Sequence, residues 1–487
     1  MLEKITHILF STKLLMPDLI FAGVFLIVVT IVAFTKKSTQ SYNLFNTLTI
    51  SVLISIGFVF YVFLGFMDQY FDAGIVLFHN LIYLDKLSIF FKILVTVSAI
   101  FVILHLWIVG YKVMAEFYAI FLAAILGLFV LSMTNHLLML YVALEMVSIC
   151  SYILVAINKS KANAEAGIKY LLTGATSSAV MLYGISLLYG MTGSLQLGSQ
   201  EFATFLGQNP SWVANIAAFM TLGGLLFKLS AAPFHSWTPD VYEATPTPIV
   251  AFLSIAPKVG VIVVIIRFLS ALSIDFRLIM SIIIIGSLLI GNLSALWQNN
   301  TKRMLGYSTI AHAGFMLVGL LAINEFGVQS AIFYVATYMF ITLAAFVLVD
   351  LLALKTDSYE LTSLQGLGQE NIFLGLSAVV IMIALVGFPP TVGFTGKLLI
   401  FTALWDSYQS SNNQLLLIVL IISLLNTAIS VFYYLKIPYF MIFKEAKVGA
   451  KRYQLGFFKK GLLFIFVFMI IYLFVKPDTL MKLIESL

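Results

Sequence analysis

Apolar runs separated by short polar segments recur from one end of the chain to the other. Runs of roughly 20 apolar residues are long enough to cross a bilayer as helices. The pattern predicts an all-α polytopic membrane protein with about fourteen transmembrane helices. The predicted spans are 15–35, 45–66, 88–110, 114–133, 136–157, 163–190, 212–232, 248–273, 277–298, 303–323, 327–354, 372–405, 413–436 and 461–475.

Proline interrupts the seventh of these spans. Lys228 lies inside the apolar run, and Pro233 follows it closely. Proline has no N–H and its ring clashes with the carbonyl one turn back, so the helix is expected to break near Ser230. Lys258 lies inside the next span. Non-helical backbone persists at membrane depth only inside protein or beside a watery cavity. The stretch Leu222–Gly260 therefore predicts a polar pocket at mid-membrane that carries an ion or a proton.

The twelfth span is built in the same way. Pro389 and Pro390 interrupt it, and Lys397 follows within the same run. Interrupted segments at corresponding positions of two halves indicate an inverted repeat with sites near the midplane. The sequence therefore predicts two inverted five-helix repeats, spans four to eight and nine to thirteen, each with a broken helix. The predicted domains are an N-terminal three-helix segment at 1–112, the first repeat at 113–273, the second repeat at 274–437, and a cytoplasmic loop with the last helix at 438–487.

Composition supports the same class of protein. The 487 residues are 61% hydrophobic and only 10% charged, which is not the balance of a soluble domain. The net charge of +6 is not a nucleic-acid signal, because the basic residues lie mostly in loops, where topology places them. The N-terminal segment lacks the pattern of a cleaved signal peptide.

The distribution of basic residues predicts the orientation in the membrane. Loops after odd-numbered spans carry Lys36, Lys37, Lys112, Lys159, Lys161, Lys302, Arg303, Lys355, Lys436, Lys444, Lys447, Lys451, Arg452, Lys459 and Lys460, and the opposite side carries Lys4, Lys13, Lys86, Lys92, Arg277, Lys476 and Lys482. This excess of about two to one predicts that both termini face away from the cytoplasm. On that outer side, alternation in Gly74–Phe78 predicts a short hairpin within the loop Asp68–Lys86.

The residue patterns that carry redox or nucleotide chemistry are missing. The single cysteine, Cys150, cannot hold an iron–sulfur cluster, which needs about four ligands. The six histidines are scattered without metal-ligand spacing, and no glycine-rich nucleotide loop follows a strand pattern. We therefore expect neither a cofactor nor a metal in this chain.

Ionisable residues inside the spans are the candidate functional residues, because such residues are costly in lipid and mark ion or proton pathways. They are Glu145, Lys169, Lys228, Lys258, His312 and Lys397, with Arg267 as a further candidate near a span end. Together they predict a polar axis across the membrane interior that relays protons.

Glu145 is expected to pair with Lys228 and to control when that lysine releases its proton. The C-terminus of a half-helix favours the ammonium form of Lys228, whereas burial disfavours it. The structural alternatives are an ion pair that only joins two helices and a lysine that only supports the kink.

The other candidates also have two interpretations each. Lys169 either belongs to the relay or extends its ammonium to the membrane surface. Lys258 and Lys397 either carry protons or pair with distant carboxylates or carbonyls. His312 either passes protons through both ring nitrogens or is a hydrogen-bonded core residue.

Four motifs carry a resemblance to a known family. They are K-L-S-A-A-P-F-H-S-W-T-P-D-V-Y-E at Lys228–Glu243, E-A-G-I-K-Y-L-L-T-G-A at Glu165–Ala175, L-L-Y-G-M-T-G-S at Leu187–Ser194, and G-F-P-P-T-V-G-F-T-G-K at Gly387–Lys397. The chain resembles the antiporter-like membrane subunits of proton-translocating NADH:quinone oxidoreductase, respiratory complex I. Lys397 and the P-D-V-Y-E motif are similar to the N type of these subunits.

This resemblance implies a function and its residues. Glu145, Lys169, Lys228, Lys258, His312 and Lys397 match the positions of the family's proton relay. FMN, iron–sulfur clusters and quinone are then expected in partner subunits. The implied neighbours are an antiporter-like M subunit, small K/J-type subunits and the lipid bilayer of a bacterial inner membrane, with no nucleic acid.

Three alternatives to this function stay open. The shared motifs also fit a subunit of a multisubunit sodium/proton antiporter that works without redox partners. A structural scaffold that merely retains the lysines is a second alternative. A third is a photosynthetic complex that uses plastoquinone, because nothing in the sequence names the quinone or the electron donor.

Overall fold

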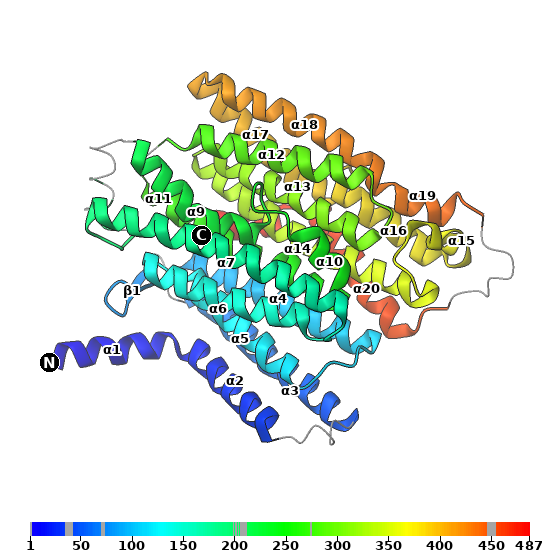
Figure 1. The fold of residues 1–487 in the computed structure, drawn as a ribbon, viewed down its shortest axis with the longest axis horizontal. Coiled ribbons are helices and arrows are strands. Elements are labelled where there is room, and N and C mark those ends of the chain that lie inside the picture. The colour runs from blue at the N-terminus through cyan, green and yellow to red at the C-terminus, as the bar shows by residue number, and fades with distance from the viewer. Residues whose placement is uncertain are drawn as a thin grey trace. The chain divides into compact units, whose positions relative to one another are not determined.

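The computed structural model describes residues 2–34, 42–69, 74–197, 199, 202, 204, 212–272, 275–445 and 454–487. The loop residues Lys36, Lys37, Lys447, Lys451 and Arg452 and the predicted domain boundary at 273–274 lie outside these ranges. Within them the chain is almost entirely helical (Figure 1), as the apolar pattern predicts. Twelve of the described helices are long and apolar enough to cross a membrane, and two shorter apolar helices are Glu116–Ser132 and Ile372–Val386. The predicted total of fourteen spans and the inverted repeats stay predictions.

The chain divides into two compact units. The first comprises Met1–Lys228, Ala256–Asp275 and Leu487, and the second comprises Leu229–Ile255 and Phe276–Ser486. Helices that lie wholly or mainly in the first unit are α1 (Leu2–Leu14), α2 (Met16–Phe34), α3 (Tyr42–Gln69), α4 (Lys86–Val109), α5 (Glu116–Ser132), α6 (Leu137–Ala156), α7 (Lys161–Thr192), α9 (Trp212–Leu229) and α11 (Thr247–Ala271).

Helices of the second unit are α10 (Thr238–Ala244), α12 (Arg277–Leu296), α13 (Thr301–Leu321), α14 (Glu325–Thr356), α15 (Leu367–Glu370), α16 (Ile372–Val386), α17 (Val392–Ser411), α18 (Gln414–Tyr434), α19 (Lys436–Ile442), α20 (Phe457–Val475) and α21 (Asp478–Glu485), together with the short 3₁₀ helix η2 (Leu361–Leu364). Helices α1, α10, α15, α19 and α21 and the 3₁₀ helix η2 were not among the predicted elements. The predicted spans otherwise agree with the helices to within a few residues.

Both predicted helix breaks are confirmed. Helix α9 ends at Leu229, and Ser230 follows in the left-handed region with φ of 65°. The chain then turns through a non-helical segment before α10 begins. The second break separates α16 from α17, with Gly387 at φ of 87°. Only glycine adopts this conformation without steric cost.

The predicted hairpin is also confirmed. Strands β1 (Ile75–Leu77) and β2 (Ile82–Leu84) pair antiparallel. The amide of Tyr83 donates to the carbonyl of Met133 at 2.8 Å, which joins the hairpin to the end of α5. The Arg267 guanidinium donates to the Ser132 carbonyl and to Asp85 Oδ1, both at 2.7 Å. Arg267, the further candidate for the relay, therefore holds the hairpin against α5 within the first unit.

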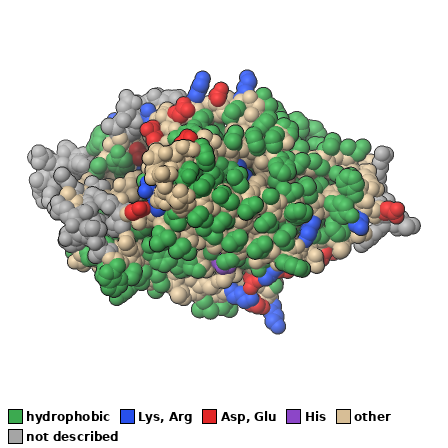
Figure 2. Space-filling model, turned by 90° about the horizontal axis from the view of Figure 1, so that it is seen from above, with side chains coloured by type: hydrophobic (Ala, Val, Ile, Leu, Met, Phe, Trp, Pro, Cys, Tyr) green, Lys and Arg blue, Asp and Glu red, His purple; other side chains and the backbone are tan. Residues whose placement is uncertain are grey.

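Burial separates interior helices from outer ones. Almost every described side chain of α11, α13 and α14 is buried, whereas most of those of α2, α18 and α20 are not. On the face drawn in Figure 2, hydrophobic side chains cover most of the described surface and charged ones are few. An exposed apolar surface of this extent must be covered by lipid or by another protein.

Lys92 corrects one prediction of the charge pattern. The charge pattern assigns Lys92, near the start of the predicted span 88–110, to the outer side of the membrane, but α4 begins six residues earlier and Lys92 is buried. Its ammonium donates to both carboxylate oxygens of Asp18, each at 2.8 Å, and lies 5.1 Å from the centroid of the Phe63 ring. The pair joins α4 to α2 in the first unit.

Replacing Lys92 with methionine should lower the free energy of unfolding by about 3–5 kcal/mol, because the Asp18 carboxylate loses its partner in a largely buried position. The double change Lys92→Met with Asp18→Leu should recover most of that loss. Thermal unfolding in detergent measures both variants. A single variant as stable as the double one would contradict a buried ion pair.

Candidate functional site

Lys228 occupies an aromatic site at the first helix break. Its side chain is 1% exposed, and its ammonium donates to the Tyr170 hydroxyl at 3.1 Å. The nitrogen lies 5.3 Å from the Tyr152 ring centroid, 5.0 Å from that of Tyr170 and 5.8 Å from that of Phe227. These three residues are the Lys228 ring cluster. Aromatic faces attract a cation more weakly than a carboxylate does, so the ammonium is held without a counter-ion in direct contact.

Gly174 of α7 makes room for this ring cluster. A Cβ at that position would lie 1.8 Å from the Tyr152 hydroxyl oxygen and 3.1 Å from a Phe227 ring carbon. The structure shows that Gly174 admits a tyrosine ring beneath Lys228.

Glu145 lies in α6, within electrostatic reach of Lys228. Its Oε1 atom is buried and has no hydrogen-bond partner among the described residues. No ion pair within 4.0 Å joins the two side chains, although both lie in the described part of the chain. The predicted pair is thus a through-space interaction in this structure. A change in the charge or position of Glu145 can therefore change the proton affinity of Lys228 without breaking a direct contact.

Lys258 and Lys169 lie in different environments, one buried and one exposed. Lys258 is fully buried in α11, as a membrane-interior relay residue should be. Lys169 lies on the outer face of α7, with 47% of its side chain exposed, and pairs with Glu165 at 3.0 Å. Its neighbour Tyr170 points inward to Lys228. Of the two interpretations for Lys169, this placement favours the surface lysine.

His312 lies inside the second unit between two tyrosine hydroxyls. Its Nδ1 lies 2.6 Å from the Tyr334 hydroxyl, and its Nε2 lies 2.9 Å from that of Tyr434. The Tyr338 ring packs against the imidazole at 4.5 Å between centroids, with the two planes tilted by 31°. With both nitrogens hydrogen-bonded, the imidazole can accept a proton on one side and release one on the other.

Lys397 lies at the second helix break. Its ammonium donates to the carbonyl of Val386, the last residue of α16, at 2.7 Å and lies 4.2 Å from the Phe315 ring centroid. The C-terminal end of a helix is a favourable place for a cation. Lys228 likewise lies in the last turn of its helix.

A small cavity connects Lys397 with His312. It has a volume of about 10 Å³ and is lined by His312, Tyr334, Thr337, Tyr338, Ile341, Ala384, Gly393 and Lys397. That volume is close to the smallest space that holds one water. One water between these hydroxyl, imidazole and ammonium groups can pass a proton between Lys397 and His312.

The comparisons with known proteins identify the family of the chain. Residues 134–426 match the family model described as NADH:quinone oxidoreductase/Mrp antiporter, TM. The chain belongs to this antiporter family. All six predicted site residues lie inside the matched segment.

Relatives and solved structures extend the likeness to nearly the whole chain. NADH-quinone oxidoreductase subunit N 2 of Chloroherpeton thalassium is 34% identical over 455 residues, which cover 89% of this chain and 86% of the relative. A chain in the structure of respiratory complex I from Thermus thermophilus with bound aureothin is 28% identical, with a TM-score of 0.79, and the match covers 96% of this chain and 98% of that one. A chain of the Mrp complex from Dietzia sp. is 17% identical, with a TM-score of 0.82 over 96% of each chain, which shows a shared fold.

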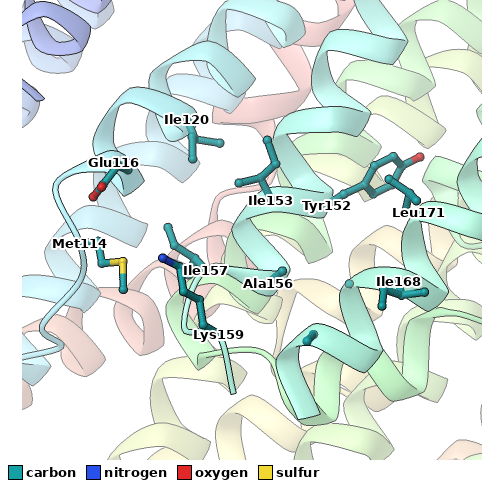
Figure 3. A pocket seen from close by; sticks show the side chains of 12 residues that line it. Met114, Glu116, Ile120, Tyr152, Ile153, Ala156, Ile157, Lys159, Ile168 and Leu171 are labelled. Carbon is teal, nitrogen blue, oxygen red and sulfur yellow. The ribbon is translucent and has the colours of Figure 1, made fainter. Parts of the chain in front are cut away.

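An apolar groove in the first unit reaches the Lys228 ring cluster of this antiporter-family chain. It has a volume of about 530 Å³ and lies between the start of α5, the end of α6 and the start of α7. Tyr152 is one of its lining residues (Figure 3), and Glu116 and Lys159 are two others. An apolar chain or a partner side chain in the groove would therefore touch a ring that also contacts Lys228.

Besides Lys92, three buried ionisable residues of the described part of the chain, His105, Asp350 and Lys302, were not among the candidates. Asp350 lies inside α14 and is 1% exposed, and Lys302 lies in the first turn of α13 and is 3% exposed. The distribution of basic residues places Lys302 in a loop, which is wrong because α13 begins at Thr301 and the Lys302 side chain is buried. Asp350 falls within the predicted span 327–354, so the rule that selected Glu145 should have selected it too.

Proposed function

We propose that this chain is an antiporter-like membrane-arm subunit of a proton-translocating NADH:quinone oxidoreductase. The observation that carries the proposal is Lys228, buried at a helix break over three aromatic rings and within electrostatic reach of Glu145. A buried lysine whose charge depends on a movable carboxylate can bind and release a proton. Family membership and the relatives named subunit N support the redox-linked assembly.

The relay has a stage in each unit. Quinone chemistry in other subunits changes the charge or hydration beside Glu145, and the ammonium of Lys228 then releases its proton to water. Lys258 and His312 receive protons in turn, and Lys397 releases them to the outside through the cavity that it shares with His312. Each step transfers one proton and leaves the donor one charge more negative. Lys169 acts at the surface rather than inside the relay.

The assembly around the chain follows from the same proposal. FMN, iron–sulfur clusters and quinone belong to partner subunits, and this chain contributes the proton path. Its neighbours are an antiporter-like M subunit and small K/J-type subunits in a bacterial inner membrane. Both termini lie on the non-cytoplasmic side, as the distribution of basic residues predicts.

A second candidate function is a subunit of a multisubunit sodium/proton antiporter. The high TM-score with a chain of the Mrp complex favours it at the level of the fold. The two functions differ in dependence on NADH. Proton uptake that requires NADH oxidation supports the redox-linked subunit, and sodium-driven proton movement without NADH supports the antiporter.

The deciding experiment replaces Lys228 with methionine and, separately, Glu145 with glutamine, in membranes that carry the assembled complex. Methionine keeps the length and apolar contacts of Lys228 but carries no proton. We expect NADH:quinone turnover and proton uptake to fall together by about a hundredfold at Lys228→Met, a typical loss for an acid–base group. Lys161→Met, on the exposed first turn of α7, is the matched control and should leave both rates unchanged. Native gels verify assembly.

Full turnover and full proton uptake in assembled Lys228→Met complex would show that Lys228 only supports the kink. Full turnover with lost uptake would show a proton path that is not coupled to quinone reduction. Either result would remove the central residue from the proposed mechanism.

A further inference from the structure

A second group of ionisable side chains lies where α13 begins and α14 ends. The Lys302 ammonium donates to the Thr245 carbonyl at 2.5 Å and lies 4.7 Å from the Tyr359 ring centroid. The Tyr359 hydroxyl donates to Asp350 Oδ1 at 3.1 Å, and the Thr247 hydroxyl lies 3.0 Å from the Tyr359 oxygen. Lys302 and Asp350 also interact electrostatically. A buried base, a buried acid and a phenol thus share one site.

This group has a hydrated neighbour at the protein surface. Arg303 follows Lys302 directly and donates to Asp240 and Glu243, each at 2.7 Å. The side chains of these three residues are 30%, 31% and 40% exposed. Glu243 also interacts electrostatically with Lys302. Carboxylates in contact with water therefore lead to the buried lysine.

A row of side chains leads inward along α14 from Asp350. Tyr334, Tyr338, Thr342, Phe346 and Asp350 are each four residues apart, so each neighbours the next on the helix surface. Tyr334 is hydrogen-bonded to His312, and the Tyr338 ring packs against the His312 ring. The Thr342 hydroxyl is buried and interacts with the Tyr338 side chain, and it has no other hydrogen-bond partner among the described residues. A buried polar group in that state is a natural partner for water.

Phe346 is the apolar member of the row. Asp350 and Thr342 are two steps apart, about 12 Å along the helix, which exceeds any direct proton transfer. The Phe346 ring fills the interval and packs against Tyr242 at 5.9 Å between centroids. A proton can pass only when water replaces part of that packing.

We propose that Lys302, Asp350 and Tyr359 form a second proton-loading site, within the second unit, which supplies His312 along the α14 row in addition to the protons that come by way of Lys258, with Phe346 as its barrier. This inference rests on the proposed function. A hydronium ion gives its proton to the Asp350 carboxylate, which becomes a neutral acid and loosens its interaction with Lys302. The acid then returns the proton to water beside Thr342, the carboxylate is restored, and His312 takes up the proton as imidazolium.

The test uses Asp350→Asn and Asp350→Glu in membranes that carry the assembled complex. Asparagine keeps the hydrogen bond from Tyr359 but cannot carry a proton, so NADH-driven proton uptake should fall at least about tenfold. Added azide, a small diffusible acid–base pair, should restore much of the rate in Asp350→Asn, and Asp350→Glu should stay active. A structural contact would not be rescued by azide. Lys355→Met, near the end of the same helix, is the matched control and should keep its rate.

Unchanged proton uptake in Asp350→Asn would overturn the inference, and so would a loss that neither azide nor glutamate restores, because the group would then only hold α10 in place. Phe346→Ala gives an independent measurement. It should raise passive proton leakage through sealed vesicles, and unchanged leakage would exclude the barrier. Lys228→Met is measured in parallel: if it loses uptake while Asp350→Asn does not, the loading site fails and the proposed function stands.

Discussion

Gly393→Ala should disrupt the packing of α17 against α16 at the second helix break and abolish proton translocation. A Cβ on Gly393 would lie 1.9 Å from the carbonyl oxygen of Ala384. That oxygen belongs to the backbone of α16, so it cannot rotate away as a side chain can. Helix α17 would have to move away from α16 and would carry Lys397 with it.

The cost should exceed the ~1–3 kcal/mol that is typical of overpacked cores. The amount of folded protein in membranes, followed by thermal unfolding in detergent, measures it. Gly461→Ala in α20 is the control, because its Cβ would meet nothing within 4 Å and alanine favours a helix by up to about 1 kcal/mol. Wild-type yield and stability for Gly393→Ala would show that the two helices are not in contact at this position.

Lys397→Met should abolish proton translocation and also weaken the junction of α16 and α17. The methionine cannot carry a proton, and the Val386 carbonyl loses the ammonium that donates to it. A buried carbonyl left without a partner costs about 1–3 kcal/mol. This double effect makes the expected loss larger than at Lys228, whose ammonium donates to a tyrosine hydroxyl.

Lys397→Arg separates the two effects. Arginine can still donate to the Val386 carbonyl, but it does not release its proton. Thermal stability should therefore return toward the wild-type value while NADH-driven proton uptake stays at the level of the methionine variant. An active arginine variant would show that the position needs only a positive charge and that Lys397 does not itself carry protons.

The sequence predicted best what local chemistry determines. Prolines next to lysines placed both breaks, since a missing N–H acts on the carbonyl one turn away. Alternation over a few residues was enough for the hairpin. Glu165, four residues before Lys169, was a local signal of a surface pair that the predicted relay did not use.

Contacts between distant segments could not be predicted in the same way. Tyr152, Tyr170 and Phe227 surround Lys228 from three helices, and no spacing in the chain brings them together. Lys92 was misplaced because its partner Asp18 is 74 residues away. In the sequence, a lysine near the start of an apolar run has the same local pattern whether its side chain faces water or a buried carboxylate.

The contacts by which Arg267 holds the hairpin against α5, the hairpin clamp, have a consequence for biosynthesis of the chain. Strands β1 and β2 emerge from the ribosome early, yet the Arg267 guanidinium that binds Asp85 and the end of α5 is made 182 residues after Asp85. Five helices of the first unit, α4, α5, α6, α7 and α9, must be inserted in between. If one of them failed to insert, Arg267 would arrive on the wrong side of the bilayer and could not reach its acceptors. The clamp thus forms only when the preceding helices have the correct topology. A correctly inserted chain therefore differs in structure from an incorrectly inserted one once Arg267 has been made, and membrane quality control can act on that difference.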